Sequence, residues 1–150
     1  MFRLIAITLS IFLTVTVSLC NMPATWAVGI SNGHLTDCPA SPNCVVSQGA
    51  DDKHAIEPIP YHLDRNKARE ILLKVLTVVP RTEVIEQTDN YIHATSQIPI
   101  FGFIDDVEFY FPPNEPVIHL RSASRLGDWD LGVNRRRVEQ IRLALHDLNI

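Results

Sequence analysis

The feature that most constrains the fold is a group of short strand-like segments enclosed by two amphipathic helical segments. Residues 65–79 carry apolar side chains at intervals of three and four, with Asp64 at the N-cap position and Pro80 at the end. Residues 134–148 repeat this spacing. Because each helix has a single apolar stripe, both helices need the same apolar sheet face to cover them.

Four segments between these helices are predicted to be strands. The segments 82–87, 91–98, 105–111 and 117–125 alternate apolar and polar residues and are separated by turn residues, of which Asp89-Asn90 marks the first hairpin. The sequence therefore predicts an α+β two-layer sandwich. Its sheet is a four-stranded antiparallel meander with the two helices on one face.

The segment before the first helix has a different character. Residues 28–63 contain many glycines and prolines and show little periodicity, which predicts an irregular N-terminal wrap on the α+β domain of residues 64–150. We take residues 28–150 as one domain. Cys38 and Cys44 flank two prolines, and a disulfide between them is the expectation for an exported protein. A zinc pair is the rival interpretation, but no second Cys/His pair at finger-like spacing accompanies it.

The start of the chain has the features of an export signal. Arg3 precedes an uncharged apolar run at residues 4–19, and small residues follow at Thr25 and Ala27. This order predicts a signal peptide over residues 1–27, cleaved after Ala27. The alternative is an uncleaved anchor, for which the run is slightly short, and membrane contact is predicted only in that case.

Charge is distributed unevenly along the chain. The chain has 13 basic and 17 acidic residues, and a net charge of −4 argues against general nucleic-acid binding. Residues 82–120 contain seven acids and no Lys or Arg, whereas residues 121–150 contain six arginines and four acids. Three interpretations remain open: acidic strands paired with an arginine-rich return segment, an anion site where arginines converge, or two solvated faces.

The candidate site is the corner formed by the last strand, the following loop and the start of the last helix. Its polar residues are Arg121, Ser122, Ser124, Arg125, Asp128, Asp130, Asn134, Arg135 and Arg137. As a functional site, arginines that meet a helix N-terminus would bind a carboxylate or phosphate group. As structure, Asp130 caps the last helix. We favour the structural interpretation, since ion-pair networks are common outside binding sites.

Two carboxylates on one strand face suggest an alternative function. Asp106 and Glu108 share a face, and with Arg121 or Arg125 as a stabiliser they would suit a small hydrolase or isomerase. Two such acids that face arginines are more often ion pairs. Asp105 lies on the opposite face, so no cation site is predicted.

We interpret several other residues as parts of the fold rather than of a functional site. We expect His93 to lie on the sheet surface and Trp129 to anchor the loop of residues 127–132 to the core. The arginines at 135–137 are expected to form solvated and capping faces of the last helix. A triad of Ser122, His119 and Asp106 is not predicted, because alternation places Ser122 and His119 on opposite strand faces.

Several motifs in the chain resemble those of one known family. They are Cys38-Pro-Ala-Ser-Pro-Asn-Cys44, Pro80-Arg-Thr82, Tyr91-Ile-His-Ala94, and the segments 102–109 and 121–135. Together they resemble the domain of unknown function 1499 family over nearly all of the mature chain. The resemblance implies an exported cyanobacterial-type member in the periplasm or thylakoid lumen. It implies no activity, because the family has none assigned.

We therefore expect an exported, non-enzymatic module that binds a small anionic ligand or a protein partner through the arginine-rich corner. The hydrolase or isomerase using Asp106 and Glu108 is the alternative, and a purely structural or stress-related lumenal protein is a third reading. No cofactor, metal or nucleic acid is expected, and the protein is predicted to be a monomer.

Overall fold

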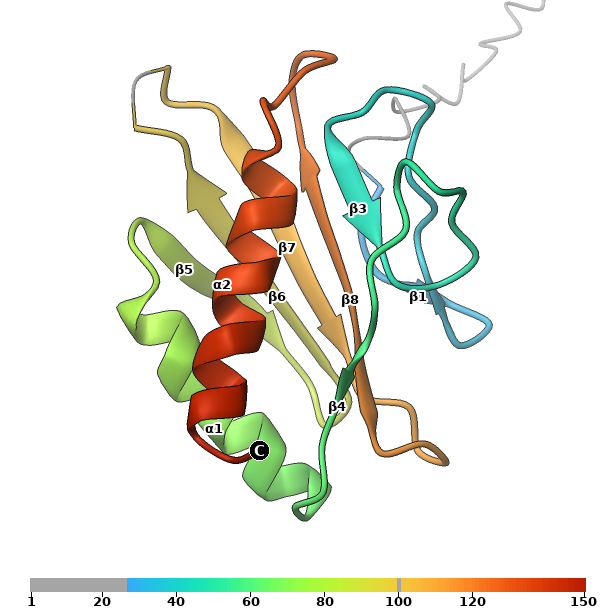
Figure 1. The fold of residues 1–150 in the computed structure, drawn as a ribbon, viewed down its shortest axis with the longest axis vertical. Helices are drawn as coiled ribbons and strands as arrows, with labels where there is room; N and C mark the ends of the chain where they lie inside the picture. The colour runs from blue at the N-terminus through green and yellow to red at the C-terminus, as the bar shows by residue number, and fades with distance from the viewer. Residues whose placement is uncertain (1–26, 100) are drawn as a thin grey trace, which may run out of the picture.

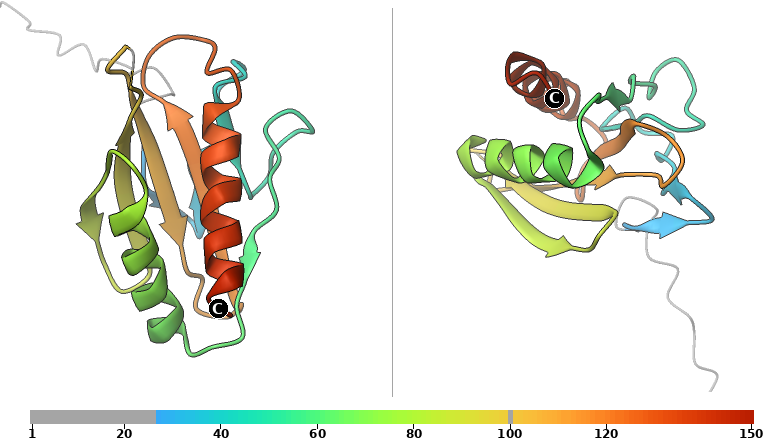
Figure 2. Two further views of the ribbon diagram at one scale, coloured as in Figure 1. Left: turned by 60° about the vertical axis from the view of Figure 1, so that its left-hand side comes forward. Right: turned by 90° about the horizontal axis from the view of Figure 1, so that it is seen from below.

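The computed structural model describes residues 27–99 and 101–150. The predicted signal peptide, apart from Ala27, lies outside the described residues. The predicted α+β two-layer sandwich is confirmed: helices α1 (Arg65–Val78) and α2 (Val133–Asp147) cover the same face of an antiparallel sheet (Figures 1 and 2). Neither helix in this described part has the length and apolar character that a bilayer span requires.

The central four strands form the predicted meander. They are β5 (Thr82–Gln87), β6 (Tyr91–Gln97), β7 (Ile104–Tyr110) and β8 (Val117–Ser124), each antiparallel to the next. The backbone N–H of Thr88 donates to the carbonyl of Tyr91 at 2.8 Å, which confirms the hairpin turn predicted between β5 and β6. The β6–β7 and β8–α2 loops lie at the same end of the sheet (Figure 1).

The N-terminal segment is more regular than predicted. Strand β3 (Cys44–Val46) pairs with one half of β8, and β4 (Ile59–Pro60) pairs with the other half, so the sheet has six strands. Strands β1 (Ile30–Ser31) and β2 (His34–Leu35) form a separate short hairpin. The remainder of residues 28–63 is irregular, as predicted, but these short strands were not predicted. Their pairing is long-range, and strands of two or three residues are too short to show alternation.

Both faces of the sheet are covered. The main core lies between the sheet and the helices, and its fully buried side chains include Leu72, Leu76, Phe109, Phe111, Ile118, Leu120, Ile141 and Leu145. A smaller cluster of Leu35, Val46, Tyr91 and Tyr110 lies on the opposite face. Figure 2 shows β1 on this second side, away from the helices. Buried side chains on both faces leave the interior strands little contact with solvent.

The ends of the helices follow their local sequence. Asp64 caps α1, because its carboxylate accepts hydrogen bonds from the backbone N–H groups of Asn66 and Lys67. The loop before α2 differs from expectation: Trp129 is 77% exposed and does not anchor the loop to the core.

The predicted disulfide between Cys38 and Cys44 is present. It closes a small loop beside the end of β8, where Asn43 O accepts a hydrogen bond of 3.0 Å from the backbone N–H of Ser124. The Asn43 amide donates to the carbonyl oxygen of Gly127. The disulfide loop therefore supports the β8–α2 loop.

Reducing this disulfide is expected to lower the free energy of unfolding by about 2 kcal/mol, because the reduced unfolded chain gains conformational freedom. Urea denaturation with and without a reductant measures the change, and a Cys38→Ser/Cys44→Ser variant in non-reducing buffer is expected to match the reduced protein. Alkylation of both thiols in the untreated native protein would contradict the assignment.

Candidate functional site

The residues of the predicted corner divide between the two faces of β8. Ser122 and Ser124 contact Asn134 of α2, whereas Arg121 and Arg125 bind carboxylates of β7 on the opposite face. This division follows from the alternation of side chains along a strand. These residues therefore do not converge on one pocket.

A buried hydrogen-bond cluster joins β8 to the start of α2. The Asn134 amide nitrogen donates to Ser124 Oγ at 3.0 Å and to Asp130 Oδ2 at 2.9 Å, and Ser122 Oγ donates to Asn134 Oδ1 at 2.5 Å. The N-cap residue of α2 is Gly132 rather than Asp130, but Asp130 accepts hydrogen bonds from the backbone N–H groups of Gly132 and Asn134 and so holds the start of the helix. The hydrogen-bonding groups of Asn134 are thus used within the protein.

Arg137 extends this cluster to β7. Its guanidinium donates to Asp105 Oδ2 at 2.6 Å and to Asn134 Oδ1 at 2.9 Å, and both ionic side chains are buried. The expectation of solvated arginines at 135–137 is therefore wrong for Arg137. Arg137 lies three residues after Asn134 and four before Ile141, so it shares the buried stripe of α2.

The opposite face of the sheet holds a second buried pair. Arg121 Nη1 lies 2.8 Å from Glu108 Oε2, and both side chains are fully buried. Glu108 Oε1 accepts hydrogen bonds from the Tyr91 hydroxyl and from the backbone N–H of Gly29, at 2.7 and 2.6 Å. Burial raises the pKa of Tyr91 well above its usual range, and the Glu108 charge adds to this effect. Glu108 thus fastens the N-terminal segment to the sheet.

Asp106 is the third buried carboxylate of β7. Arg125 contacts both of its oxygens, with Nε–Oδ2 at 3.0 Å and Nη2–Oδ1 at 2.8 Å, and His93 Nε2 lies 2.8 Å from Oδ1. Burial alone would raise the pKa of Asp106, but hydrogen bonds from His93 and Arg125 outweigh it and hold that pKa below its usual value. His93 is buried, so the expectation that it lies on the sheet surface is wrong.

Each candidate catalytic carboxylate therefore has a cationic partner. Asp106 is paired with Arg125, and Glu108 is paired with Arg121. A general base or nucleophile needs a carboxylate that can reach the substrate, and an arginine clamp prevents this. The two same-face acids form the cross-strand ion pairs that the structural interpretation predicts.

A serine–histidine contact that the sequence did not predict lies at the junction of β3 and β8. Ser47 Oγ is 3.0 Å from His119 Nδ1 and accepts a hydrogen bond of 2.9 Å from the Leu120 backbone N–H. Burial lowers the pKa of His119. Neither Ser47 nor His119 lines the two cavities described below.

A cavity of 220 Å³ lies between the end of α1, the end of β6 and the start of α2. Its polar lining consists of Arg81, Ser96, Gln97, Arg136, Arg137 and Gln140, and no described acidic side chain lines it. We call it the arginine pocket. It contains two arginines of the last helix but none of Arg121, Arg125 and Arg135.

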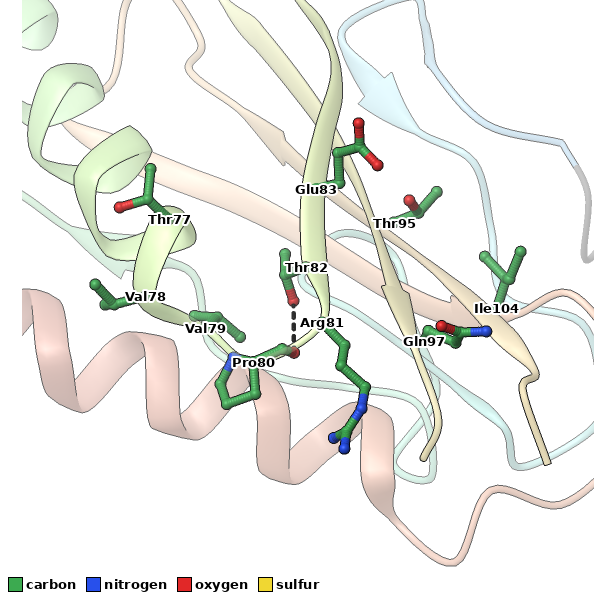
Figure 3. A pocket seen from close by; sticks show the side chains of 10 residues that line it. All are labelled: Thr77, Val78, Val79, Pro80, Arg81, Thr82, Glu83, Thr95, Gln97 and Ile104. Atoms are coloured by element: carbon green, nitrogen blue, oxygen red, sulfur yellow. Dashed lines mark hydrogen bonds between the residues drawn. The ribbon is translucent and has the colours of Figure 1, made fainter. Parts of the chain in front are cut away.

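Arg81 enters this pocket because of its backbone conformation. It has a φ of +55°, in the left-handed region that a non-glycine residue rarely adopts, and its carbonyl accepts a hydrogen bond of 3.0 Å from the Gln97 N–H. Figure 3 shows the Arg81 side chain extending away from Glu83 and Thr95, toward the ribbon of α2. Figure 3 draws the neighbouring cavity of 630 Å³, which shares Val79, Pro80, Arg81 and Gln97 with the arginine pocket and is also lined by Glu83 and Thr95.

The arginine pocket carries positive charge that the protein does not neutralise. Arg81 is exposed, and its guanidinium has no hydrogen-bond partner among the described residues. Among the residues that the structure describes, Arg136 donates only to the carbonyl of Leu131, at 2.7 Å, whereas Arg137 is neutralised by Asp105. The positive end of the α2 dipole adds to this field. Such an arrangement can bind a carboxylate or phosphate through charge-assisted hydrogen bonds.

Arg81 was not predicted to be a site residue, because the predicted site included only arginines after residue 120. The motif Pro80-Arg-Thr82 entered the sequence analysis only through the family resemblance. Arg135 lies outside the pocket, and its guanidinium donates to the carbonyls of Ala55 and Lys53 at 2.9 Å. Helical spacing places Arg137, but not its two neighbours, on the buried stripe of α2, so the sequence alone could have indicated that Arg137 is buried.

Comparison with known protein families gives one match. The family described as "Protein of unknown function (DUF1499)" matches residues 34–145. No curated protein and no solved structure matches the chain. The match extends from β2 into α2 and so includes Arg81, Arg136 and the buried ion pairs.

Replacing Asp106 with Asn tests the ion-pair interpretation. The pKa of Asp106 is lowered in the folded protein, so ionised Asp106 stabilises the fold above about pH 4, and this contribution is lost as the pH falls through the lowered pKa. Urea denaturation is expected to show Asp106→Asn less stable than wild type by roughly 2–3 kcal/mol at pH 7, with the difference shrinking toward pH 3.

Asp128→Asn is the matched control, since Asp128 is exposed and is expected to change stability by less than about 0.5 kcal/mol at either pH. A difference between wild type and Asp106→Asn that does not vary with pH would contradict the account.

Proposed function

This chain belongs to the family described as "Protein of unknown function (DUF1499)", and we propose that it is an exported, non-enzymatic module that binds a small anion in the arginine pocket. The ligand class is a small molecule with a carboxylate or phosphate group.

The observation that carries this proposal is the charge of the pocket lining. Three guanidinium groups line the cavity, and only that of Arg137 has a carboxylate partner. Gln97 and Gln140 add amide donors that would fix the orientation of a planar or tetrahedral anion. The volume of 220 Å³ is below the usual range for drug-sized ligands, which favours a small anion over a nucleotide.

The composition of the lining supports binding without catalysis. The described residues that line the arginine pocket include no histidine and no carboxylate, the side chains that most often serve as a general base. Asp106 and Glu108, on which the hydrolase or isomerase alternative rests, are held by Arg125 and Arg121. No observation favours that alternative.

Two features support export. The apolar run at residues 4–19 follows a basic residue, and small residues precede the proposed cleavage site after Ala27. The Cys38–Cys44 disulfide suits an oxidising compartment such as a periplasm or thylakoid lumen.

Anion binding is expected to depend on the two arginines without carboxylate partners. Titration calorimetry with inorganic phosphate is expected to show binding to wild type and at least about tenfold weaker binding to Arg81→Ala and to Arg136→Ala, since each loses a charge-assisted hydrogen bond. Citrate provides the carboxylate counterpart of the same titration.

Arg69→Ala is the charge-matched control. Arg69 is a half-buried arginine of α1 that contacts Thr88 and Gln87, and its loss is expected to leave the affinity for phosphate unchanged. Equal affinities for all four proteins, or no binding of phosphate and citrate to wild type, would argue against the proposal.

Export predicts a specific mature terminus. When the full chain is produced in a bacterial host, the protein in the periplasmic fraction is expected to begin at Val28, as read by intact mass and N-terminal sequencing. Recovery of only the uncleaved 150-residue chain in the cytoplasm would count against export.

A further inference from the structure

A further cavity lies at the end of α2 that is remote from the arginine pocket. It has a volume of 500 Å³ and is lined by residues 59–62, which include β4, and by four residues between 142 and 150. We call it the β4 cavity. Figure 1 shows the end of α2 at the opposite end of the molecule from the β8–α2 loop. Arg136 lines the arginine pocket and His146 lines the β4 cavity, and ten residues of helix separate them by about 15 Å.

The β4 cavity reaches into the main core. Ile59, Tyr61 and Ile150 line it, and all three belong to the main core, with exposed fractions of 3%, 9% and 6%. Its volume lies within the usual range for ligand pockets, about 300–1,000 Å³. A cavity of this size with apolar walls can remove the apolar part of a small ligand from water.

The hydroxyl of Tyr61 is available in this cavity. Tyr61 is buried, but its hydroxyl has no hydrogen-bond partner among the residues that the structure describes. The hydroxyl is not sealed in the core, because the buried polar side-chain atoms without a partner belong to Asp105 and Arg121. Since the Tyr61 side chain lines the β4 cavity, its hydroxyl opens into that space. A buried phenol usually has a partner, so this one can donate to a ligand oxygen.

The position of Tyr61 is fixed by the rest of the fold. Its backbone N–H donates to the carbonyl of Pro116 at 2.9 Å, and its ring packs against that of Phe111 with centroids 6.1 Å apart. Burial raises the pKa of Tyr61 above its usual value, so the hydroxyl keeps its proton at neutral pH. The donor is therefore held in place before a ligand binds, which lowers the entropic cost of binding.

The charges around the β4 cavity favour a neutral ligand. The guanidinium of Arg142 is fully used, since Nε lies 3.0 Å from Glu139 Oε2, Nη1 donates to the carbonyl of Pro58 at 2.9 Å, and Nη2 donates to the carbonyl of Glu57. No acidic side chain lines the cavity in the described part of the chain, so a cation would find no carboxylate. The carbonyl end of the α2 dipole disfavours an anion.

These features define a class of ligand. We propose that the β4 cavity binds a small, neutral, mainly apolar molecule that carries a carbonyl oxygen, and that this oxygen accepts a hydrogen bond from the Tyr61 hydroxyl. His62, His146 and Asn149 add further polar groups to the lining. Binding in this cavity is independent of anion binding in the arginine pocket, because the two cavities share no residue.

Methyl NMR of protein labelled at isoleucine δ1 carbons tests the proposal. The probe is 1-tetralone, a neutral ketone, and tetralin is the matched hydrocarbon without the oxygen. The signals of Ile59 and Ile150 are expected to move saturably with 1-tetralone, whereas that of Ile85, an exposed residue of β5, is expected to stay in place. Stationary Ile59 and Ile150 signals, or equal movement of the Ile85 signal, would overturn the proposal.

Tyr61→Phe separates the hydrogen bond from the fold. Because the hydroxyl has no partner among the described residues, the melting temperature is expected to be unchanged. The affinity for 1-tetralone is expected to fall about fivefold, as for the loss of one hydrogen bond, while that for tetralin stays the same.

Tyr110→Phe is the matched control, since it removes a hydroxyl from the opposite face of the sheet and is expected to change neither affinity. Equal affinity of wild type and Tyr61→Phe for 1-tetralone, or an equal loss of affinity for tetralin, would overturn the role assigned to the Tyr61 hydroxyl.

Discussion

The packing of this structure depends on three buried carboxylates on strand β7. An unpaired buried charge costs several kcal/mol, so each acid of β7 requires a cation. The pairs are Asp105–Arg137, Asp106–Arg125 and Glu108–Arg121. The first pair fixes α2 against one face of the sheet. The other two lie on the opposite face, where Glu108 also holds the N-terminal segment through Gly29.

These pairs determine which arginines remain for binding. Arg121 and Arg137 are buried, and Arg135 is occupied by backbone carbonyls of the N-terminal segment. Arg81 and Arg136 have no carboxylate partner among the described residues. Both line the arginine pocket, and Arg136 also donates to the carbonyl of Leu131. The arginines that are available for binding therefore lie near one end of the sheet, whereas the acidic residues of β7 stabilise the fold.

The sequence predicted the parts of the fold that depend on local pattern. Helical spacing located α1 and α2, and the Asp89-Asn90 turn located the β5–β6 hairpin. The pairing of Asp106 and Glu108 with arginines followed from alternation on neighbouring strands. Pairing of β3 with β8 was not predictable, because it joins segments far apart in the chain and no local pattern encodes it.

The candidate site was harder to predict for the same reason. The positive φ of Arg81 and its approach to α2 depend on tertiary structure, so sequence reasoning placed the site among the later arginines alone. Trp129 was expected to anchor its loop to the core, but its side chain is exposed.

The central claim is that the arginines divide into a structural set and a binding set. Side-chain Nε–Hε signals in two-dimensional ¹⁵N–¹H NMR, followed during titration with inorganic phosphate, test both sets in one experiment. The account predicts that the signals of Arg81 and Arg136 move with phosphate concentration, while those of Arg69 and Arg125 stay in place. Movement of the Arg125 signal with a stationary Arg81 signal would contradict the account and would locate anion binding on the opposite face of the sheet.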